Sequence, residues 1–430
     1  MTALRTAPFA LLAAAALACT TPSLDVSEAA LPAGAASLAG DPALAREPGS
    51  GTLYLAWVAG PADARQVLFA RSTDGGGSWS TPVHVTPEPG DVGPPHGEAA
   101  PRFVAAGQGR VALVWSKSVP VPGRRWPASA IRFARSLDGG ATWTGPVTLN
   151  DDSTGAPGTH TFHGAAWSGD TGIVAVWLYD RGGQNFPGHH HAAASPAAAP
   201  TTESDARIFI AASADFGGTW TPNRHVWGAV CPCCRVALAR DAGGEVVSAW
   251  RQHLPGNVRD VVTAPIAPEP ADPVRVHADD WEYPGCPHTG PALAIGEGGI
   301  RHVAWYTGKP GREGVYYART DSAGRALGEP VPLVTGATVR TAHSSAVALP
   351  DGGALVATDV GTNGGRAIRI AQLRPDGRIG AAATVPGSNE GSYPQLALVD
   401  KGGALVAWTV PEGEATGLRI ARVAVESASR

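Results

Sequence analysis

The sequence carries little charge. Asp, Glu, Lys and Arg make up only 16% of its 430 residues, and the formal net charge is −4. So small a charge gives no electrostatic reason to expect nucleic acid or an anionic membrane surface as a partner. No apolar run is long enough to cross a bilayer. Glycine (55 residues) and proline (38) are abundant instead, which is typical of many short strands joined by tight turns rather than of long helices.

The first residues predict export. Arg5 precedes an apolar stretch, residues 7–18, that is rich in Ala and Leu. The stretch ends in Ala16-Leu17-Ala18-Cys19, which resembles a bacterial lipoprotein signal, although Ala16 stands where such signals usually have Leu. We therefore predict a signal peptide at 1–18, a lipid on Cys19 as the only membrane contact, and a place in the cell envelope, in the periplasm or on the outer membrane. Ordinary secretion with cleavage near Ala18 is the alternative.

One strand pattern recurs and usually ends in Trp. Its end positions define seven repeat units, numbered here in chain order: Trp57, Trp115, Trp177, Trp250, Trp305, Thr358 and Trp408. In each unit another apolar strand comes before this one and a third comes after it, and most units have a fourth. The sequence therefore predicts an all-β fold, a seven-bladed β-propeller of four-stranded antiparallel blades over residues 39–430.

The seventh unit has no fourth strand after residues 422–424. Residues 24–31, within the N-terminal segment 19–38, have no other partner. We predict that they supply the missing outer strand and close the ring, which removes an exposed sheet edge.

Three turns that follow third strands match Ser-x-Asp-x-Gly-x-x-Trp. In such a turn the Asp and Ser side chains accept backbone N–H bonds, glycine takes the left-handed conformation, and the Trp ring packs under the hairpin. The structural residues of these turns are Asp74, Trp79, Asp138, Trp143, Asp215 and Trp220. The turns resemble the Asp-box (BNR) repeats of the sialidase-like propeller families, over nearly the whole mature chain. The resemblance implies that the boxes lie on the face away from an active site, so they indicate fold and not catalysis.

Reactive side chains gather at the starts of the innermost strands, about sixteen or seventeen residues before the end of the Trp pattern in each unit. These starts cluster around one mouth of the channel in a propeller. The set comprises Asp41, Glu98, His160, Cys233, Cys234 and His288, with His163, Cys231, Arg235, Cys286, His343 and Tyr393 nearby. We expect them to form one ring.

The four cysteines of the mature chain, Cys231, Cys233, Cys234 and Cys286, all belong to units four and five. One interpretation is one or two disulfides, with Cys286 paired to one of the other three. The other is a metal site, because thiolates and imidazoles favour copper or zinc over magnesium or calcium. The candidate ligands are the four cysteines with His160, His163, His288 and His343.

Resemblance to the sialidases implies a different use of the same mouth. Those enzymes use a Tyr nucleophile activated by Glu, an Asp acid/base, and arginines that bind the substrate carboxylate. Here the corresponding candidates are Tyr393, Glu98, Asp41, Arg235 and Arg340. The sequence departs from that family, because the Arg-Ile-Pro element is absent and the family has six blades.

A third alternative is a non-catalytic module that binds carbohydrate or protein. The sequence thus predicts a monomer that binds a metal, a small ligand or a glycan at the channel mouth.

Overall fold

The computed structural model describes residues 23–123, 127–151, 158–180, 206–336, 338–340, 342–400 and 403–425. The predicted signal peptide and Cys19 lie outside these ranges. Within them the chain forms 28 β-strands and three short 3₁₀ helices, η1 (Gly97–Ala99), η2 (Pro255–Asn257) and η3 (Glu297–Gly299), and no α-helix. Among these residues no helix has the length and apolarity that a membrane crossing needs.

Each repeat unit contributes consecutive strands. Units one to three contain β2 (Ala39–Arg46), β3 (Leu53–Ala59), β4 (Gln66–Ser72), β5 (Val83–His84), β6 (Arg102–Gly107), β7 (Arg110–Val119), β8 (Ala128–Ser136), β9 (Val147–Thr148), β10 (Thr159–Ser168), β11 (Gly172–Asp180), β12 (Arg207–Ser213) and β13 (Arg224–Trp227). Units four and five contain β14 (Ala237–Arg240), β15 (Val246–Leu254), β16 (Val258–Ala267), β17 (Val274–Arg275), β18 (Ala292–Ile295), β19 (Arg301–Thr307), β20 (Gly314–Thr320) and β21 (Val331–Thr335). Units six and seven contain β22 (Ala342–Ala348), β23 (Ala354–Thr362), β24 (Gly365–Leu373), β25 (Ile379–Thr384), β26 (Ser392–Asp400), β27 (Gly403–Glu412) and β28 (Ala415–Ala424), while β1 (Val26–Glu28) precedes them all.

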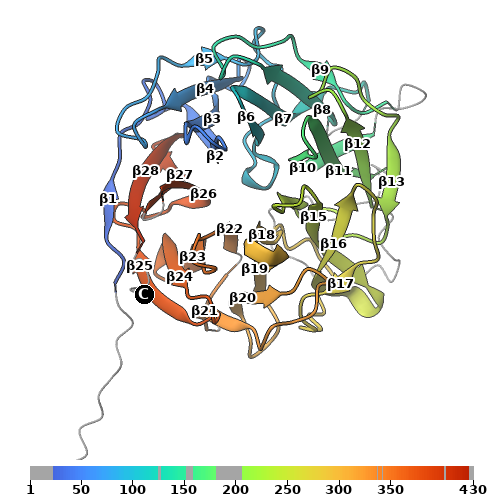
Figure 1. The fold of residues 1–430 in the computed structure, drawn as a ribbon, viewed down its shortest axis with the longest axis vertical. Helices are drawn as coiled ribbons and strands as arrows, with labels where there is room; N and C mark the ends of the chain where they lie inside the picture. The colour runs from blue at the N-terminus through green and yellow to red at the C-terminus, as the bar shows by residue number, and fades with distance from the viewer. Residues whose placement is uncertain are drawn as a thin grey trace, which may run out of the picture.

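The strands pair as antiparallel sheets that stand around a common centre (Figure 1). In the described part of the chain, five sheets have four strands and one has eight. The larger sheet joins units two and three through one parallel pair, Ser129 with Thr159. The first strands of the units, such as β2, β10, β22 and β26, lie toward the centre, and the short fourth strands lie at the rim (Figure 1). The starts of the first strands therefore surround the central axis.

The N-terminal strand β1 pairs with the last strand, β28, in register Val26 with Val423 and Glu28 with Ala421. The backbone N–H of Ala29 continues the ladder to the carbonyl of Ile420 at 3.0 Å. Beyond it, the indole Nε1 of Trp79 donates to the carbonyl of Ala30 at 2.9 Å. Because β1 covers β28, the sheet of unit seven joins the first and the last strand of the described residues.

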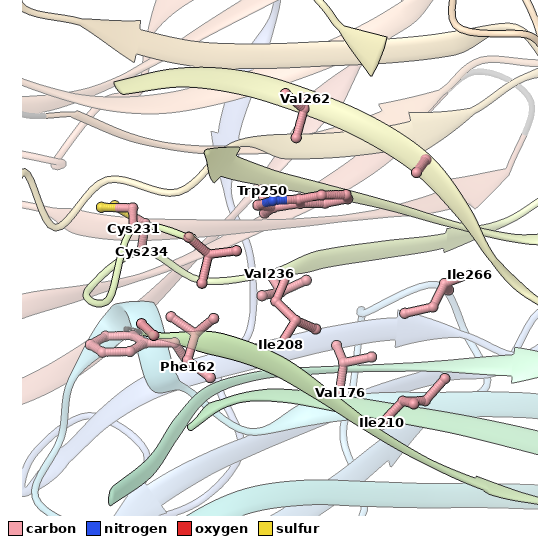
Figure 2. Close-up of a cluster of buried hydrophobic side chains, with 14 of the residues drawn as sticks. Phe162, Val176, Ile208, Ile210, Cys231, Cys234, Val236, Trp250, Val262 and Ile266 are labelled. Carbon is pink, nitrogen blue, oxygen red and sulfur yellow. The ribbon is translucent and has the colours of Figure 1, made fainter. Parts of the chain in front are cut away.

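The apolar core lies between neighbouring sheets. The side chain of the Trp pattern packs against the preceding unit: Trp57 of unit one contacts the cluster of Leu405 and Ala407 of unit seven, and Trp250 of unit four packs with Val176 and Ile208 of unit three (Figure 2). All six of these Trp side chains are at most 2% exposed. Such rings account for much of the burial, because a Trp buries more apolar area than other side chains.

Unit six has Thr358 where the other units have Trp. A cavity of about 260 Å³ lies beside it, lined by Leu333 and Val334 of unit five and by Val356 and Ile370 of unit six. The space beside Thr358 is therefore partly open to solvent at the interface between units five and six.

The three Asp-box turns have the contacts that their sequence predicts. In the first, the Asp74 carboxylate accepts the backbone N–H of Ser78 at 2.9 Å, and the Ser72 hydroxyl accepts the N–H of Gly76 at 2.8 Å. Gly76, with φ +88°, occupies the left-handed region that glycine adopts without strain. The Asp74 carboxylate also accepts a hydrogen bond from the hydroxyl of Ser78. This bond, followed by the other hydrogen bonds to the carboxylate, holds the pKa of Asp74 well below its ordinary value.

The Trp rings of the boxes pack onto the preceding unit. Trp143 meets Phe69 edge to face at 5.2 Å between ring centroids, and Trp220 meets Phe133 in the same way at 4.9 Å. The second and third boxes, around Asp138 and Asp215, repeat the hydrogen bonds of the first. The boxes therefore fasten neighbouring sheets together.

Candidate functional site

The starts of the inner strands contain an unusual backbone. Asp41, Phe162, His288 and Tyr393 all have positive φ, between +49° and +54°, a region that non-glycine residues seldom adopt. In units one, three and seven this residue lies in a register shift between the first two strands. Bulges of this kind redirect side chains, and strained backbone collects at functional sites. The recurrence of the same geometry marks the starts of the inner strands as the place to look for function.

Three cysteines lie together between β13 and β14, in the loop that enters unit four. The Sγ of Cys231 is 3.1 Å from that of Cys234 and 3.7 Å from that of Cys233. Each of the three side chains is 1% exposed. Cys231 and Cys234 border the apolar cluster between units three and four, near Phe162 (Figure 2). All four cysteines in the described residues are free thiols.

A second group of ligand atoms joins the first. Cys286 and His288, in the loop before β18 of unit five, lie with Cys233 so that all three ligand atoms are within 4.8 Å of one another. The same limit holds for Cys231, Cys233 and Cys234. Cys233 therefore belongs to both groups. Cys286 is only half-buried, so the pair of groups opens to solvent on this side.

Two arginines place positive charge beside the thiols. Burial opposes ionisation of Cys231, but hydrogen bonds from Cys233 and Cys234 and the charges of Arg259 and Arg251 bring its pKa well below the ordinary value. Burial raises the pKa of Cys233 and of Cys234. The two arginines therefore favour negative charge on the sulfur atoms of this cluster.

The arginines themselves are fixed by backbone oxygens. Arg251 is 1% exposed and donates to the carbonyls of Thr289, Arg259 and Tyr306. Arg259 donates through Nε to the carbonyl of Tyr283 at 3.2 Å, while its buried Nη1 has no hydrogen-bond partner among the described residues. A buried guanidinium with unused donor capacity beside thiols favours an anionic cluster there.

The other predicted metal ligands lie apart from these groups. His343 bonds Asp359 through Nδ1 at 2.9 Å and donates from Nε2 to the carbonyl of His288 at 2.9 Å. His343 thus holds the backbone of His288 rather than joining the ligand atoms. His160 stacks on Tyr179 at 4.4 Å between centroids. His163 is fully buried, and burial with the charge of Arg102 lowers its pKa to about 3.

Glu98 and Arg235 form a buried ion pair on the axis. Nη1 of Arg235 is 2.9 Å from Oε1 of Glu98. Oε2 accepts the backbone N–H groups of Gly290 at 2.6 Å and Arg235 at 3.1 Å. Arg235 also donates to the carbonyls of Pro291 and Ser344. The pair therefore connects units two, four, five and six. Burial would raise the pKa of Glu98, but Arg235 and its other partners hold it below the ordinary value.

Tyr393 packs on this network instead of facing a free carboxylate. Its ring centroid is 4.1 Å from that of His343, and its backbone N–H donates to Asp359 at 2.8 Å. A Cβ on Gly97 would come within 1.9 Å of the Tyr393 ring, so only glycine fits there. Both oxygens of Glu98 are already engaged, and Arg340 is exposed. Of the residues expected from the sialidase resemblance, Glu98 and Arg235 thus pair with each other. Burial raises the pKa of Tyr393, and the charges of Glu98 and Asp41 raise it further.

Sequence reasoning missed Asp359, which is fully buried and receives Arg366 at 2.9 Å as well as His343. It directly follows Thr358 in the Trp pattern, where the other units have Val, Ser, Leu, Arg, Tyr and Thr. The acidic side chain at this position, which the other units lack, is the sequence signal that could have identified Asp359.

Asp41 is 5% exposed and accepts the backbone N–H of His96 at 2.6 Å. Burial raises its pKa to about 6, against this hydrogen bond and the charges of Arg102 and Arg65. Between about pH 4 and 6 the folded chain therefore holds a proton that the unfolded chain has lost, and Asp41 makes stability fall as the pH rises through this window.

We expect Asp41→Asn to remove this dependence. When the pH is raised from 4 to 7, the unfolding free energy of the variant should rise by about 3 kcal/mol relative to that of the unaltered chain. This follows because one pKa unit corresponds to about 1.4 kcal/mol. Urea unfolding at the two pH values measures the change. Asp63→Asn, in an exposed turn, serves as the control and should shift neither value. Parallel pH profiles for Asp41→Asn and the unaltered chain would contradict the assignment.

Comparison with known proteins places this architecture. No family model and no curated protein matches the sequence. Among solved structures, the BP39L lectin from Burkholderia pseudomallei has 13% identity and a TM-score of 0.59, with 92% of this chain and 98% of that chain covered. A protein of Dyadobacter fermentans has 14% identity and a TM-score of 0.53, with 93% and 99% covered. The fold is a β-propeller, similar to that of the BP39L lectin.

An intramolecular trans-sialidase from Ruminococcus gnavus has 14% identity and a TM-score of 0.48, with 92% of this chain and 96% of that chain covered. At such identities the likeness concerns the fold alone. The function of this chain therefore depends on the residues at the starts of its own inner strands.

Proposed function

We propose that the chain is an exported, lipid-anchored, seven-bladed propeller that binds a soft metal ion, copper or zinc, at one mouth of its channel. The observation that carries the proposal is the pair of three-ligand groups built from four cysteines and His288. Sulfur and imidazole ligands select such metals over magnesium and calcium, which require oxygen ligands. The site would act by capturing the ion, and no reaction is attached to it.

The proposed propeller consists of seven radial sheets. The eight-stranded sheet divides at its single parallel pair into the sheets of units two and three, and β1 completes unit seven. Read in this way, the seven sheets form a closed ring. The closed ring brings the loops of units four and five together, so that cysteines far apart in sequence share one site.

His288 is suited to its role by its surroundings. Its carbonyl accepts from His343, which in turn is held by Asp359. Hydrogen bonds that hold a ligand in place are usual at metal sites. Their loss typically lowers the metal affinity by about 10–100-fold.

Metal binding is tested on the mature chain without a histidine tag, with its thiols reduced. We expect zinc or copper(I) to bind, as measured by elemental analysis and by competition with a chelator. Cys286→Ser should weaken binding by at least about tenfold, because it removes a ligand from a partly exposed position. His84→Ala, at an exposed histidine of β5, is the matched control and should bind as the unaltered chain does. A reduced chain that binds neither metal would overturn the proposal, as would four thiols that prove to be paired in disulfides.

A sialidase-type activity is the second candidate, supported only by the fold and by the presence of Tyr393 at the mouth. It requires release of a fluorescent aglycone from a sialoside, and that release must be lost in Tyr393→Phe. Absence of turnover, or turnover that persists in the variant, removes this candidate.

A further inference from the structure

The ligand atoms at the channel mouth form two groups of three rather than one group of four. Cys231, Cys233 and Cys234 make up the first, and Cys233, Cys286 and His288 the second. Among the described residues no four ligand atoms lie within 4.8 Å of one another. We infer that the site holds two copper(I) ions, each with three ligands, and that the thiolate of Cys233 bridges them. This inference rests on the proposed function and specifies the metal and its number.

Geometry favours this arrangement over one zinc ion. Structural zinc is almost always tetrahedral with four ligands, at metal–sulfur distances of about 2.3 Å, so its four sulfur atoms lie roughly 3.8 Å apart. Three ligands around one ion at the same bond length lie roughly 4 Å apart. The contacts of Cys231 with Cys233 and Cys234, at 3.7 and 3.1 Å, are shorter than this spacing and do not separate the two metals, so the distinction rests on the three ligands in each group. Thiolate-rich sites with few ligands suit copper(I), which is soft.

Charge also agrees with two monovalent ions. Binding proceeds without electron transfer: four thiols release four protons and two copper(I) ions enter. Five copper–sulfur bonds form, two of them to the shared Cys233, with one copper–nitrogen bond to His288, and the four thiolates with two copper(I) ions carry a net charge of minus two. Arg251 and Arg259, both at least nine-tenths buried, supply two positive charges beside these sulfurs. The filled site is therefore neutral as a whole, which matters because an uncompensated buried charge is costly.

The position of Cys233 explains why the loop needs adjacent cysteines. Cys231, Cys233 and Cys234 come from the loop that enters unit four, and Cys286 and His288 come from the loop of unit five, while all four cysteines pack against one apolar cluster. Cys233 stands between the two loops and is the residue that both groups contain. A bridging thiolate at this point would bind units four and five together through metal.

The test is the copper stoichiometry of the reduced, tag-free mature chain. Under anaerobic conditions, copper(I) is added from a complex with bathocuproine disulfonate, and the metal that the protein removes from the chelator is counted. We expect two copper ions per chain, and X-ray absorption should show a copper neighbour at short distance in addition to sulfur. Exactly one tightly bound ion would overturn the bridged pair while leaving metal binding intact. No bound ion would overturn the proposed function as well.

Variants separate the two positions. Cys286→Ser removes a ligand of the second group only, so one copper should remain and the copper–copper signal should disappear. Cys233→Ser removes the shared ligand and should weaken both positions. His84→Ala should keep two ions. Two tightly bound ions in both cysteine variants would contradict the bridge, and if Cys233→Ser does not fold, the count and the absorption spectrum of the unaltered chain decide.

Discussion

Replacing Glu98 with Gln is expected to lower the free energy of unfolding by about 3–5 kcal/mol, because it leaves the cation of Arg235 buried without its counter-charge. Glu98 is completely buried, and Arg235 is 5% exposed. The carboxylate also accepts two backbone N–H groups, of Gly290 and Arg235, which lie in the loops that enter two other units. The loss would therefore be felt across the centre of the ring and not in one sheet. Urea unfolding at neutral pH measures it.

A second substitution distinguishes the ion pair from simple loss of packing. Arg235→Met in the Glu98→Gln background removes the orphaned charge, and replacing both members of a buried pair is often nearly neutral. We expect the double variant to recover part of the lost stability. Asp321→Asn, which breaks an exposed pair with Arg325, should cost less than about 1 kcal/mol. A cost this small for Glu98→Gln would show that the axial pair contributes little.

Trp57→Thr is expected to cost about 3–5 kcal/mol, the range for removal of a buried Trp or Phe side chain. The ring is fully buried between units one and seven, in contact with the cluster of Leu405 and Ala407. Its Nε1 has no hydrogen-bond partner among the residues that the structure describes, so the substitution removes packing and no hydrogen bond. The variant places Thr at the position of the repeat where unit six already has Thr358. Thermal and urea unfolding provide the measurement, and a cost below about 1 kcal/mol would contradict the packing argument.

The reciprocal change, Thr358→Trp, should raise the stability instead. The cavity of about 260 Å³ is lined by Thr358 itself, the counterpart of the Trp of the other units, and filling a cavity commonly gains about 0.5–2 kcal/mol. Thr358→Val, which keeps the cavity, is the control. If Thr358→Trp is destabilising by more than about 1 kcal/mol, the residues that line the cavity leave too little room for an indole ring, which contradicts the prediction.

The repeating parts of the molecule could be predicted from sequence because their physics is local. The Trp positions mark the second strand of each unit, and the Ser-x-Asp-x-Gly-x-x-Trp turns carry their hydrogen bonds within a few residues. Contacts across the axis could not be predicted in this way. That Glu98 meets Arg235 depends on how far each unit turns about the centre, which no single repeat encodes.

The histidines show the limit most clearly. Counting along the units placed His160 and His288 in the same column, yet His160 stacks on Tyr179 while His288 joins the cysteines. Successive side chains of a strand point to opposite faces, so a shift of one residue reverses them. The bulges at the inner strand starts introduce such shifts, as between Thr161 and Gly164. Cys231, Cys233 and Cys234 lie close together because all three belong to one short turn.

The pairing of β1 with β28 has a mechanical consequence. A pull on the chain ahead of Ser23 is borne first by the contacts of Ser23 and Leu24 with Ala382, then by a strand of three residues, Val26–Glu28, and by the indole bond of Trp79 to Ala30. These contacts would peel away one after another, each at low force, whereas the long pair of β27 and β28 would resist. Because both partners come from opposite ends of the chain, this pairing also has the greatest loop to close, and it is expected to be the last to form during folding.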